Sequence, residues 1–177
     1  DGQGIGDIHA IPTAELTTEV LAEHMEDDVA HCVAASVVPD RSPVLREVFG
    51  DRLTLIDHRT DLGISIDYPH PSQIGADRLA NAVACAELLG APSIAIDFGT
   101  AVTFDIVAGA PGRAVYVGGV IAPGLEAMTH YLHDRTALLP ELTLDEPPSA
   151  IGKSTVHAMQ AGAVLGYRGL VKEILSE

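Results

Sequence analysis

The sequence predicts a mixed α/β protein built of two lobes. Residues 13–89 alternate between helical and strand-like patterns. Residues 93–107 carry apolar side chains at every second position, residues 114–121 form a further strand-like run, and residues 125–177 return to a mostly helical pattern. The change of period predicts a first lobe at residues 1–92 and a second lobe at residues 93–177.

In the first lobe, short polar residues and glycine mark the expected ends of helices. Thr13 and Ser42 are residue types that cap helix N-termini, and Gly90 is typical of the position after a helix. β-branched, apolar runs predict buried strands, the first of which ends at Pro39. The expected elements are helices at 13–28, 43–49 and 77–89, strands at 32–38 and 53–56, and a loop at 61–73.

In the second lobe, the alternating segment is expected to fold as a β-hairpin that turns at Gly99 and Thr100. Ser154 is expected to cap the last helix, in which Gly162 and Gly166 predict close packing within the core or across a dimer. The expected elements are a hairpin at 93–107, a strand at 114–121, a helix at 125–135, a linker at 139–148 and a helix from 154 to the end.

Composition excludes several classes of protein. The chain has 177 residues with 10 basic and 25 acidic side chains, so its net charge is −15. This charge repels a phosphate backbone and an anionic membrane surface, which argues against nucleic-acid and membrane partners. No apolar run is long enough for a membrane span, no secretory signal is visible, and two cysteines make no disulfide framework. We therefore expect an acidic, soluble, cytoplasmic protein.

The segment Ile96–Asp105, I-D-F-G-T-A-V-T-F-D, is the first candidate site. Asp97 ends a buried strand, Gly99 allows a ligand to approach the backbone, and Thr100 adds a hydroxyl. Such a turn can hold a cation and offer N–H and O–H groups to phosphate oxygens. An ordinary hairpin with a solvated aspartate remains the alternative.

The segment Ile74–Arg78, I-G-A-D-R, is the second candidate and lies at a predicted helix N-terminus. The free backbone N–H groups there favour anions. Asp77 would stay ionised and could accept a proton from a hydroxyl that attacks phosphorus, and Arg78 could bind a carboxylate. The alternative is a capping aspartate with a surface arginine.

Two further segments contain glycine beside possible ligand contacts. In Gly118–Gly124, G-G-V-I-A-P-G, adjacent glycines leave room for a planar group or a phosphate, or else form a tight turn. In Ile151–Thr155, I-G-K-S-T, the spacing is not that of a P-loop, but the Thr155 hydroxyl could face a ligand.

Two other patterns are given structural interpretations. The glycine-rich start at residues 1–7 is read as a turn rather than a phosphate loop. His130 and His133 lie three residues apart but lack a third ligand at a recognisable spacing, so they are read as surface histidines.

Taken together, these motifs make the chain resemble type III pantothenate kinase, a family of the actin, hexokinase and Hsp70 phosphotransferase superfamily. The resemblance spans nearly the whole chain. It is carried by A-S-V-V-P at 35–39, Y-P-H-P-S-Q-I-G-A-D-R at 68–78, D-F-G-T-A-V-T-F-D at 97–105, G-G-V-I-A-P-G at 118–124 and I-G-K-S-T-V-H-A-M-Q-A-G at 151–162. It implies two ribonuclease H-like lobes with mixed sheets flanked by helices.

The resemblance implies phosphorylation of pantothenate to 4′-phosphopantothenate by ATP with Mg²⁺, the first step of coenzyme A synthesis. Asp77 matches the catalytic base. The residues that match substrate contacts are Tyr68, Gly75, Ala76, Asp77, Arg78 and Thr155. A homodimer with pantothenate near the subunit interface is also implied.

The resemblance further implies an activating monovalent cation, K⁺ or NH₄⁺, on Asp97. Thr100 matches a residue that contacts ATP. With it we assign Gly99, Gly118 and Gly119 to nucleotide binding.

The chain departs from the family pattern at both ends. The family opens with a strand that carries D-x-G-N-[ST] and continues past the last helix, and neither feature is found here. We therefore expect the isolated 177-residue chain to be weakly active or inactive. Two alternatives remain open: a catalytically impaired member that acts as a regulatory accessory factor, and a different kinase of the superfamily.

Overall fold

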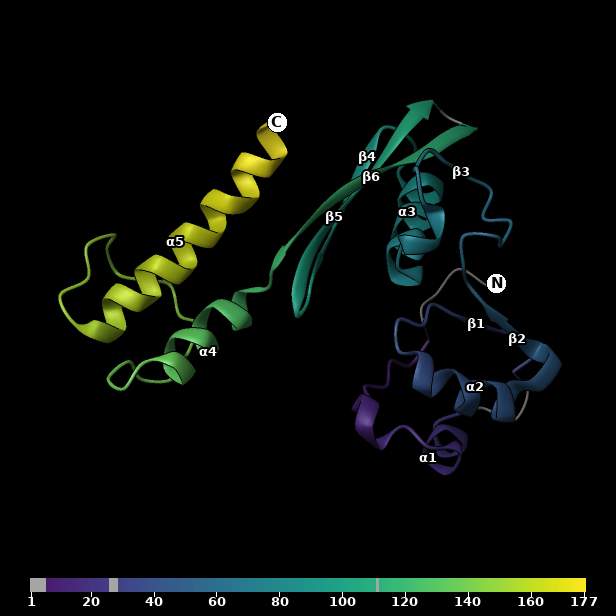
Figure 1. Cartoon of the computed structure of the whole chain (residues 1–177), viewed down its shortest axis with the longest axis horizontal. Coiled ribbons are helices and arrows are strands. Elements are labelled where there is room, and N and C mark those ends of the chain that lie inside the picture. The colour runs from purple at the N-terminus through teal and green to yellow at the C-terminus, as the bar shows by residue number, and fades with distance from the viewer. Residues whose placement is uncertain (1–5, 26–28, 111) are drawn as a thin grey trace.

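A computed structural model describes residues 6–25, 29–110 and 112–177. The elements are arranged along one long axis (Figure 1). Helices α4 (Leu125–Arg135) and α5 (Thr155–Ser176) lie at one end, and α1 (Thr18–Glu23) and α2 (Ser42–Phe49) lie at the other. A sheet and helix α3 (Ala76–Leu88) lie between them. The glycine-rich start falls largely on residues 1–5, outside the described ranges.

The N-terminal part contains a small βαβ unit. Strands β1 (Cys32–Ala34) and β2 (Leu53–Leu55) pair in parallel, and α2 makes the crossover between them. Helix α2 matches the expected position, while the first strand is shorter than predicted. Its extension fails because the Ser36 hydroxyl accepts from the Val38 amide at 3.4 Å, a local bond that competes with strand pairing.

Two predicted caps in this part are wrong. The expected helix at 13–28, whose residues 26–28 lie outside the described ranges, divides over residues 13–25 into a 3₁₀ turn (Thr13–Glu15) and α1. The N-cap of α1 is Thr17, which accepts from the Val20 amide at 3.3 Å. Ser42 is the first residue of α2 rather than its cap. Several short polar residues stand close together here, and residue type alone does not say which one caps.

The central sheet has the strand order β3-β6-β5-β4. Strands β4 (Ser93–Phe98), β5 (Ala101–Ala110) and β6 (Arg113–Pro123) form an antiparallel meander, which confirms the predicted hairpin. Strand β3 (Ser65–Ile66) pairs in parallel with β6 inside the segment predicted to be a loop. A strand of two residues is too short to produce a recognisable sequence period.

Strand β6 contains a β-bulge. Ile106 pairs with Gly118 and Val107 pairs with Tyr116, so Val117 is an extra residue on β6. Gly118 has a φ of +115°, in the region that favours glycine. The Gly118–Gly119 pair therefore lies inside a strand and does not form the tight turn that was the alternative.

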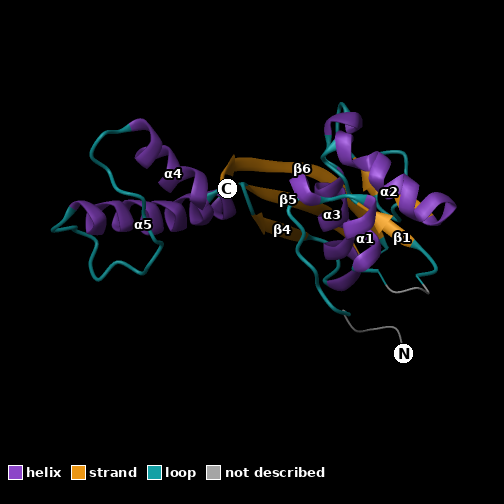
Figure 2. Ribbon diagram, turned by 90° about the horizontal axis from the view of Figure 1, so that it is seen from below, coloured by secondary structure: helices purple, strands orange, loops and turns teal. Residues whose placement is uncertain are grey.

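Helix α3 covers one face of the sheet, whereas only the C-terminal end of α5 reaches the sheet and packs on its other face (Figure 2). The α3 side packs on a core of Ile74, Leu79, Ala82, Val107 and Tyr116. The α5 side packs Tyr167 against Val102 and Phe104. Phe104 and Asp105 are consecutive on β5 and thus face opposite layers, apolar towards α5 and charged towards α3.

Helix ends in the second half follow the predictions. Gly90 follows α3 with a φ of +83° and donates its amide to the Cys85 and Ala86 carbonyls. Ser154 caps α5 by accepting from the His157 amide at 3.2 Å. No helix in the described ranges is long and apolar enough to cross a membrane.

The predicted boundary at residue 92 remains a prediction. Strand β3 and helix α3 precede that position, yet both pack on the sheet formed by residues 93–123. The mixed α/β architecture, with sheets flanked by helices, is confirmed.

Candidate active site

The N-terminus of α3 holds the I-G-A-D-R segment. Gly75 is the N-cap residue, and a Cβ there would collide with the Asp77 carboxylate. Glycine therefore allows that carboxylate to fold back over the start of the helix. Asp77 is half-buried, and its Oδ1 accepts from the Arg78 amide at 2.8 Å. The helix dipole stabilises a negative charge at this position.

Arg78 crosses from α3 to the sheet and meets Asp105 of β5. Its Nε lies 2.6 Å from Asp105 Oδ1, and the two side chains are 11% and 0% exposed. Arg78 Nη2 also donates to the Phe104 carbonyl at 3.4 Å. This is the one ion pair of the described residues that is shielded from water on both sides. Removing one partner of such a pair leaves a buried charge uncompensated.

Tyr116 of β6 completes this buried group. Its hydroxyl donates to Asp105 Oδ1 at 3.1 Å, and its ring centroid lies 5.9 Å from the Arg78 guanidinium carbon. Burial raises the pKa of Asp105, and the Arg78 charge opposes the rise. Burial and the neighbouring Asp105 both raise the pKa of Tyr116, so its hydroxyl stays a neutral donor.

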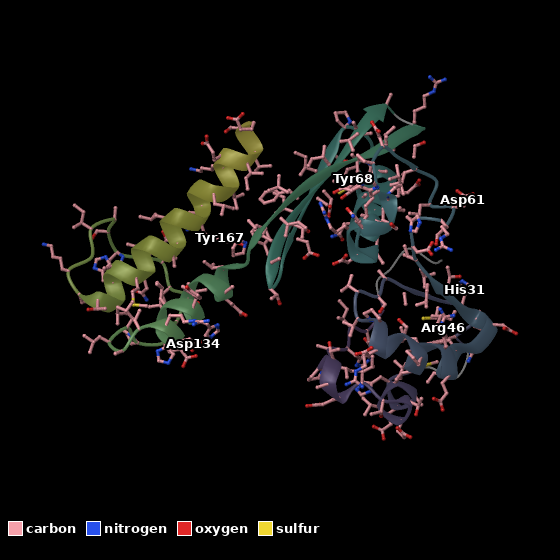
Figure 3. All side chains as sticks on the ribbon, in the orientation of Figure 1. His31, Arg46, Asp61, Tyr68, Asp134 and Tyr167 are labelled. Carbon is pink, nitrogen blue, oxygen red and sulfur yellow. The ribbon has the colours of Figure 1, made fainter. Side chains whose placement is uncertain are left out.

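The two glycines of β6 lie against this group. Gly118 contacts the Tyr68 ring, which would lie 3.5 Å from a Cβ at that position. A Cβ on Gly119 would collide with the Phe104 carbonyl and with Arg78 Nη2. Tyr68 lies next to α3, whereas Tyr167 lies on α5 (Figure 3). The structure thus brings Gly118 and Gly119 beside the predicted substrate residues Tyr68 and Arg78.

Asp97 lies near the end of β4 on the same face of the sheet. It is exposed, and its Oδ2 accepts from Asn81 Nδ2 at 3.3 Å. Thr103 pairs with Asp97 across the strands, and its buried hydroxyl has no hydrogen-bond partner among the described residues. Carboxylate, amide and hydroxyl oxygens are the donors that hard cations prefer, so the residue types fit the predicted cation. In the described ranges, no three His, Cys, Asp or Glu side chains cluster as metal ligands.

Gly99 and Thr100 form the tip of the β4–β5 hairpin. Gly99 donates its amide to the Ala101 carbonyl, and the Thr100 carbonyl accepts from the Gly124 amide, both at 3.0 Å. Both tip residues are exposed. Strand β5 begins at Ala101, four ladder positions or about 13 Å from the Asp105–Gly119 pair, and the tip lies beyond Ala101. The predicted nucleotide residues therefore fall into two groups, one at the tip and one beside Arg78.

Thr155 opens α5, at the end of the molecule away from α3 (Figure 1). It is exposed and lines an apolar hollow of about 890 Å³ between α4 and α5, with Tyr131, Leu132, Leu139 and Met159 among the walls. Within the described chain, Thr155 is not brought to Asp77. In α4, His130 lies 3.5 Å from Glu141, and His133 Nδ1 lies 3.0 Å from the Leu139 carbonyl oxygen.

Sequence reasoning did not assign roles to Asp105, Tyr116 and Asn81. The alternation along the hairpin contained a signal, because Asp97, Thr103 and Asp105 fall on one face of their strands. Tyr116 carried no such signal, since the bulge that decides its face is not visible in the sequence. Asn81 lies one helical turn after Asp77, which places it on the same side of α3.

Comparison with known proteins agrees with this set of motifs. A family model described as type III pantothenate kinase matches residues 8–177. The chain belongs to the type III pantothenate kinase family.

Curated type III pantothenate kinases align with almost the whole chain. The protein from Akkermansia muciniphila is 50% identical over 171 residues, which are 95% of this chain and 69% of that relative. The protein from Methylacidiphilum infernorum is 47% identical over 174 residues, which are 96% of this chain and 62% of that relative. The chain thus spans 62–69% of the length of these two members.

A solved structure supports the fold. It is a protein from Campylobacter jejuni assigned to the Baf family of transcriptional activators, with a TM-score of 0.59 and 19% identity, covering 90% of this chain and 69% of that one. At this identity the similarity concerns the fold alone. It adds nothing about the activity of this type III pantothenate kinase family member.

Proposed function

We propose that the protein containing this chain phosphorylates pantothenate to 4′-phosphopantothenate, the first step of coenzyme A synthesis. The observation that carries the proposal is the pairing of Asp77 at the start of α3 with a guanidinium fixed beside it by Asp105. Family membership supports the same reaction. Pantothenate offers the two matching groups, a primary hydroxyl and a carboxylate.

Asp77 acts as the general base in this proposal. Its carboxylate takes the proton of the primary hydroxyl while that oxygen forms a bond to the γ-phosphorus of ATP. The bond from the γ-phosphorus to the bridging oxygen breaks at the same time, and the electron pair leaves with ADP. ATP with Mg²⁺ supplies the phosphoryl group. Tyr68, Gly75, Ala76 and Arg78 bind and orient the substrate, with the carboxylate on Arg78.

A monovalent cation, K⁺ or NH₄⁺, is proposed at Asp97. The oxygens of Asp97, Asn81 and Thr103 support such a site, and Thr103 is a buried hydroxyl that still lacks a partner among the described residues. The acidic chain needs added positive charge to admit a nucleotide, since its net charge is −15. Gly99 and Thr100 at the exposed tip are proposed to contact ATP. Gly118 and Gly119 are proposed to contact it through their backbone, since Tyr68, Arg78 and the Phe104 carbonyl fill the space on their Cβ side.

The protein is proposed to be a homodimer. Each subunit is proposed to have two lobes of the actin type, with the boundary near residue 92. The position of Thr155 supports a dimer, because this predicted substrate contact lies far from α3 in its own chain (Figure 1). The open apolar hollow beside Thr155 and the uncontacted positions at Gly162 and Gly166 offer a surface that a second copy would cover. No observation favours the regulatory alternative or a different kinase.

The test is ADP release from ATP and Mg²⁺, measured with and without pantothenate and K⁺. The full-length gene product and Asp77→Asn are compared, with Asp134→Asn, an exposed carboxylate of α4, as the matched control. We expect release that requires pantothenate and falls at least about 100-fold in Asp77→Asn alone. Release that ignores pantothenate, or that survives in Asp77→Asn, would overturn the proposal.

A further inference from the structure

The guanidinium of Arg78 is held on several sides by the protein. Nε donates to Asp105 at 2.6 Å, and Nη2 donates to the Phe104 carbonyl at 3.4 Å next to Gly119. The Tyr116 ring lies 5.9 Å from the guanidinium carbon. Nη1 forms no hydrogen bond within the described part of the chain. Of the three guanidinium nitrogens, Nη1 is thus the one left available to a ligand in the described part of the chain.

Asp105 is itself held in place. It is fully buried, accepts from the Tyr116 hydroxyl at 3.1 Å and keeps an Oδ2 with no partner among the described residues. Burying a carboxylate costs free energy, and among the described residues this one is compensated by Arg78 and Tyr116. A fold that needed only packing at this position would be served better by an apolar residue. The arrangement favours a role exerted through Arg78.

We propose that Asp105, supported by Tyr116, is a positioning residue that holds the Arg78 guanidinium with its Nη1 end towards the substrate carboxylate. The inference rests on the proposed function and adds to it a residue that never touches the substrate. An unrestrained arginine would lose side-chain entropy on binding an anion, whereas the ion pair has already fixed its rotamer. Asp105 also balances the arginine's charge, so that the buried guanidinium is stable before the substrate arrives.

The test is a double-mutant cycle on the kinetics of pantothenate phosphorylation. Asp105→Asn is combined with Arg78→Lys, which keeps a positive charge but not the guanidinium plane. We expect Asp105→Asn to raise the KM for pantothenate about tenfold with kcat within about threefold, because the contact lies away from the reacting hydroxyl. In the Arg78→Lys background the same substitution should change KM less than about twofold.

Glu146→Gln is the matched control. Glu146 forms an exposed two-point ion pair with Arg168, whereas Asp105 is buried and meets Arg78 through Oδ1 alone. Its KM should equal that of the wild type. Equal effects of Asp105→Asn in both backgrounds would assign Asp105 to general stability and overturn the inference.

If Asp105→Asn does not fold, a milder variant, Tyr116→Phe, still tests the inference. Tyr116→Phe keeps the ring and removes the hydroxyl that holds Asp105, so KM should rise about two- to fivefold while kcat stays constant. An unchanged KM in Tyr116→Phe would overturn the inference. Wild-type protein without pantothenate-dependent ADP release would overturn the proposed function, and the inference with it.

Discussion

Arg78 and Asp105, separated by 27 positions in the sequence, are joined by a 2.6 Å contact between Nε and Oδ1 at the interface of helix and sheet. The pair connects the start of α3 to the centre of β5, and it is nearly inaccessible to water. Helix, sheet and candidate site are therefore coupled at one point. Changes in the packing of α3 should therefore alter the position of the Arg78 side chain.

The first prediction concerns Gly119. A methyl group there would overlap the Phe104 carbonyl, which cannot move without breaking the β5–β6 ladder. Gly119→Ala should lower the free energy of unfolding by about 1–3 kcal/mol or more, measured by urea denaturation. Gly169→Ala is the control: Gly169 is exposed in α5 with nothing near its Cβ position, and alanine should stabilise that helix by about 0.5–1 kcal/mol. Equal losses in the two variants would contradict the prediction.

The second prediction concerns the core beneath α3. Leu79 is completely buried, whereas Leu88 in the same helix is 82% exposed. Leu79→Ala should destabilise the protein by about 2–5 kcal/mol, because it removes buried methyl groups and leaves a cavity. Leu88→Ala should change stability by less than about 0.5 kcal/mol. Thermal and urea unfolding of both variants would check this. A loss of stability in Leu88→Ala as large as that in Leu79→Ala would show that α3 does not pack on the sheet through the face that carries Leu79.

The third prediction concerns pH. The ordinary pKa of Asp105 is 3.8, and burial raises it in the folded protein. The unfolded chain thus releases this proton at a lower pH than the folded chain does. The stability that Asp105 contributes is complete below pH 3.8 and is lost as the pH rises through the raised pKa.

Urea unfolding of wild type and Asp105→Asn over a series of pH values tests this sign. Subtracting the two curves cancels the other carboxylates of the acidic chain. The stability of Asp105→Asn relative to the wild type should rise as the pH increases from 3.8 and then level off. A relative stability that falls over the same range would mean that Arg78, rather than burial, sets the pKa of Asp105.

The fourth prediction concerns the cation and rests on the proposed function. Asp97→Asn removes the charge of the proposed ligand but keeps an oxygen, so the K⁺ concentration for half-maximal activity should rise at least about tenfold. Asp61→Asn, another exposed carboxylate that lies on a loop, is the control and should leave K⁺ activation unchanged. Identical K⁺ curves for Asp97→Asn and wild type would remove Asp97 from the cation site.

The sequence predicted elements with a clear local cause and missed those set by distant partners. Ser154 and Gly90 sit at helix ends for reasons that act within one turn, so both were predicted correctly. Strand β3 exists because β6 lies beside it, and two residues carry no period of their own. Among candidate site residues, Asp77 and Arg78 were singled out through their motif and stay predictions, while the partner of Arg78 depends on how α3 crosses the sheet.

The bulge at Val117 makes the site depend on the number of residues in β6 as well as on their kinds. Tyr116 and Gly119 are three positions apart, an odd spacing that would send them to opposite faces of a regular strand. The extra residue turns both towards α3, where one supports Asp105 and the other makes room for Arg78. Deleting Val117 would preserve every residue named in the site and still turn one of these two away from it. Homologues with a one-residue gap here would therefore need a different arrangement around their arginine.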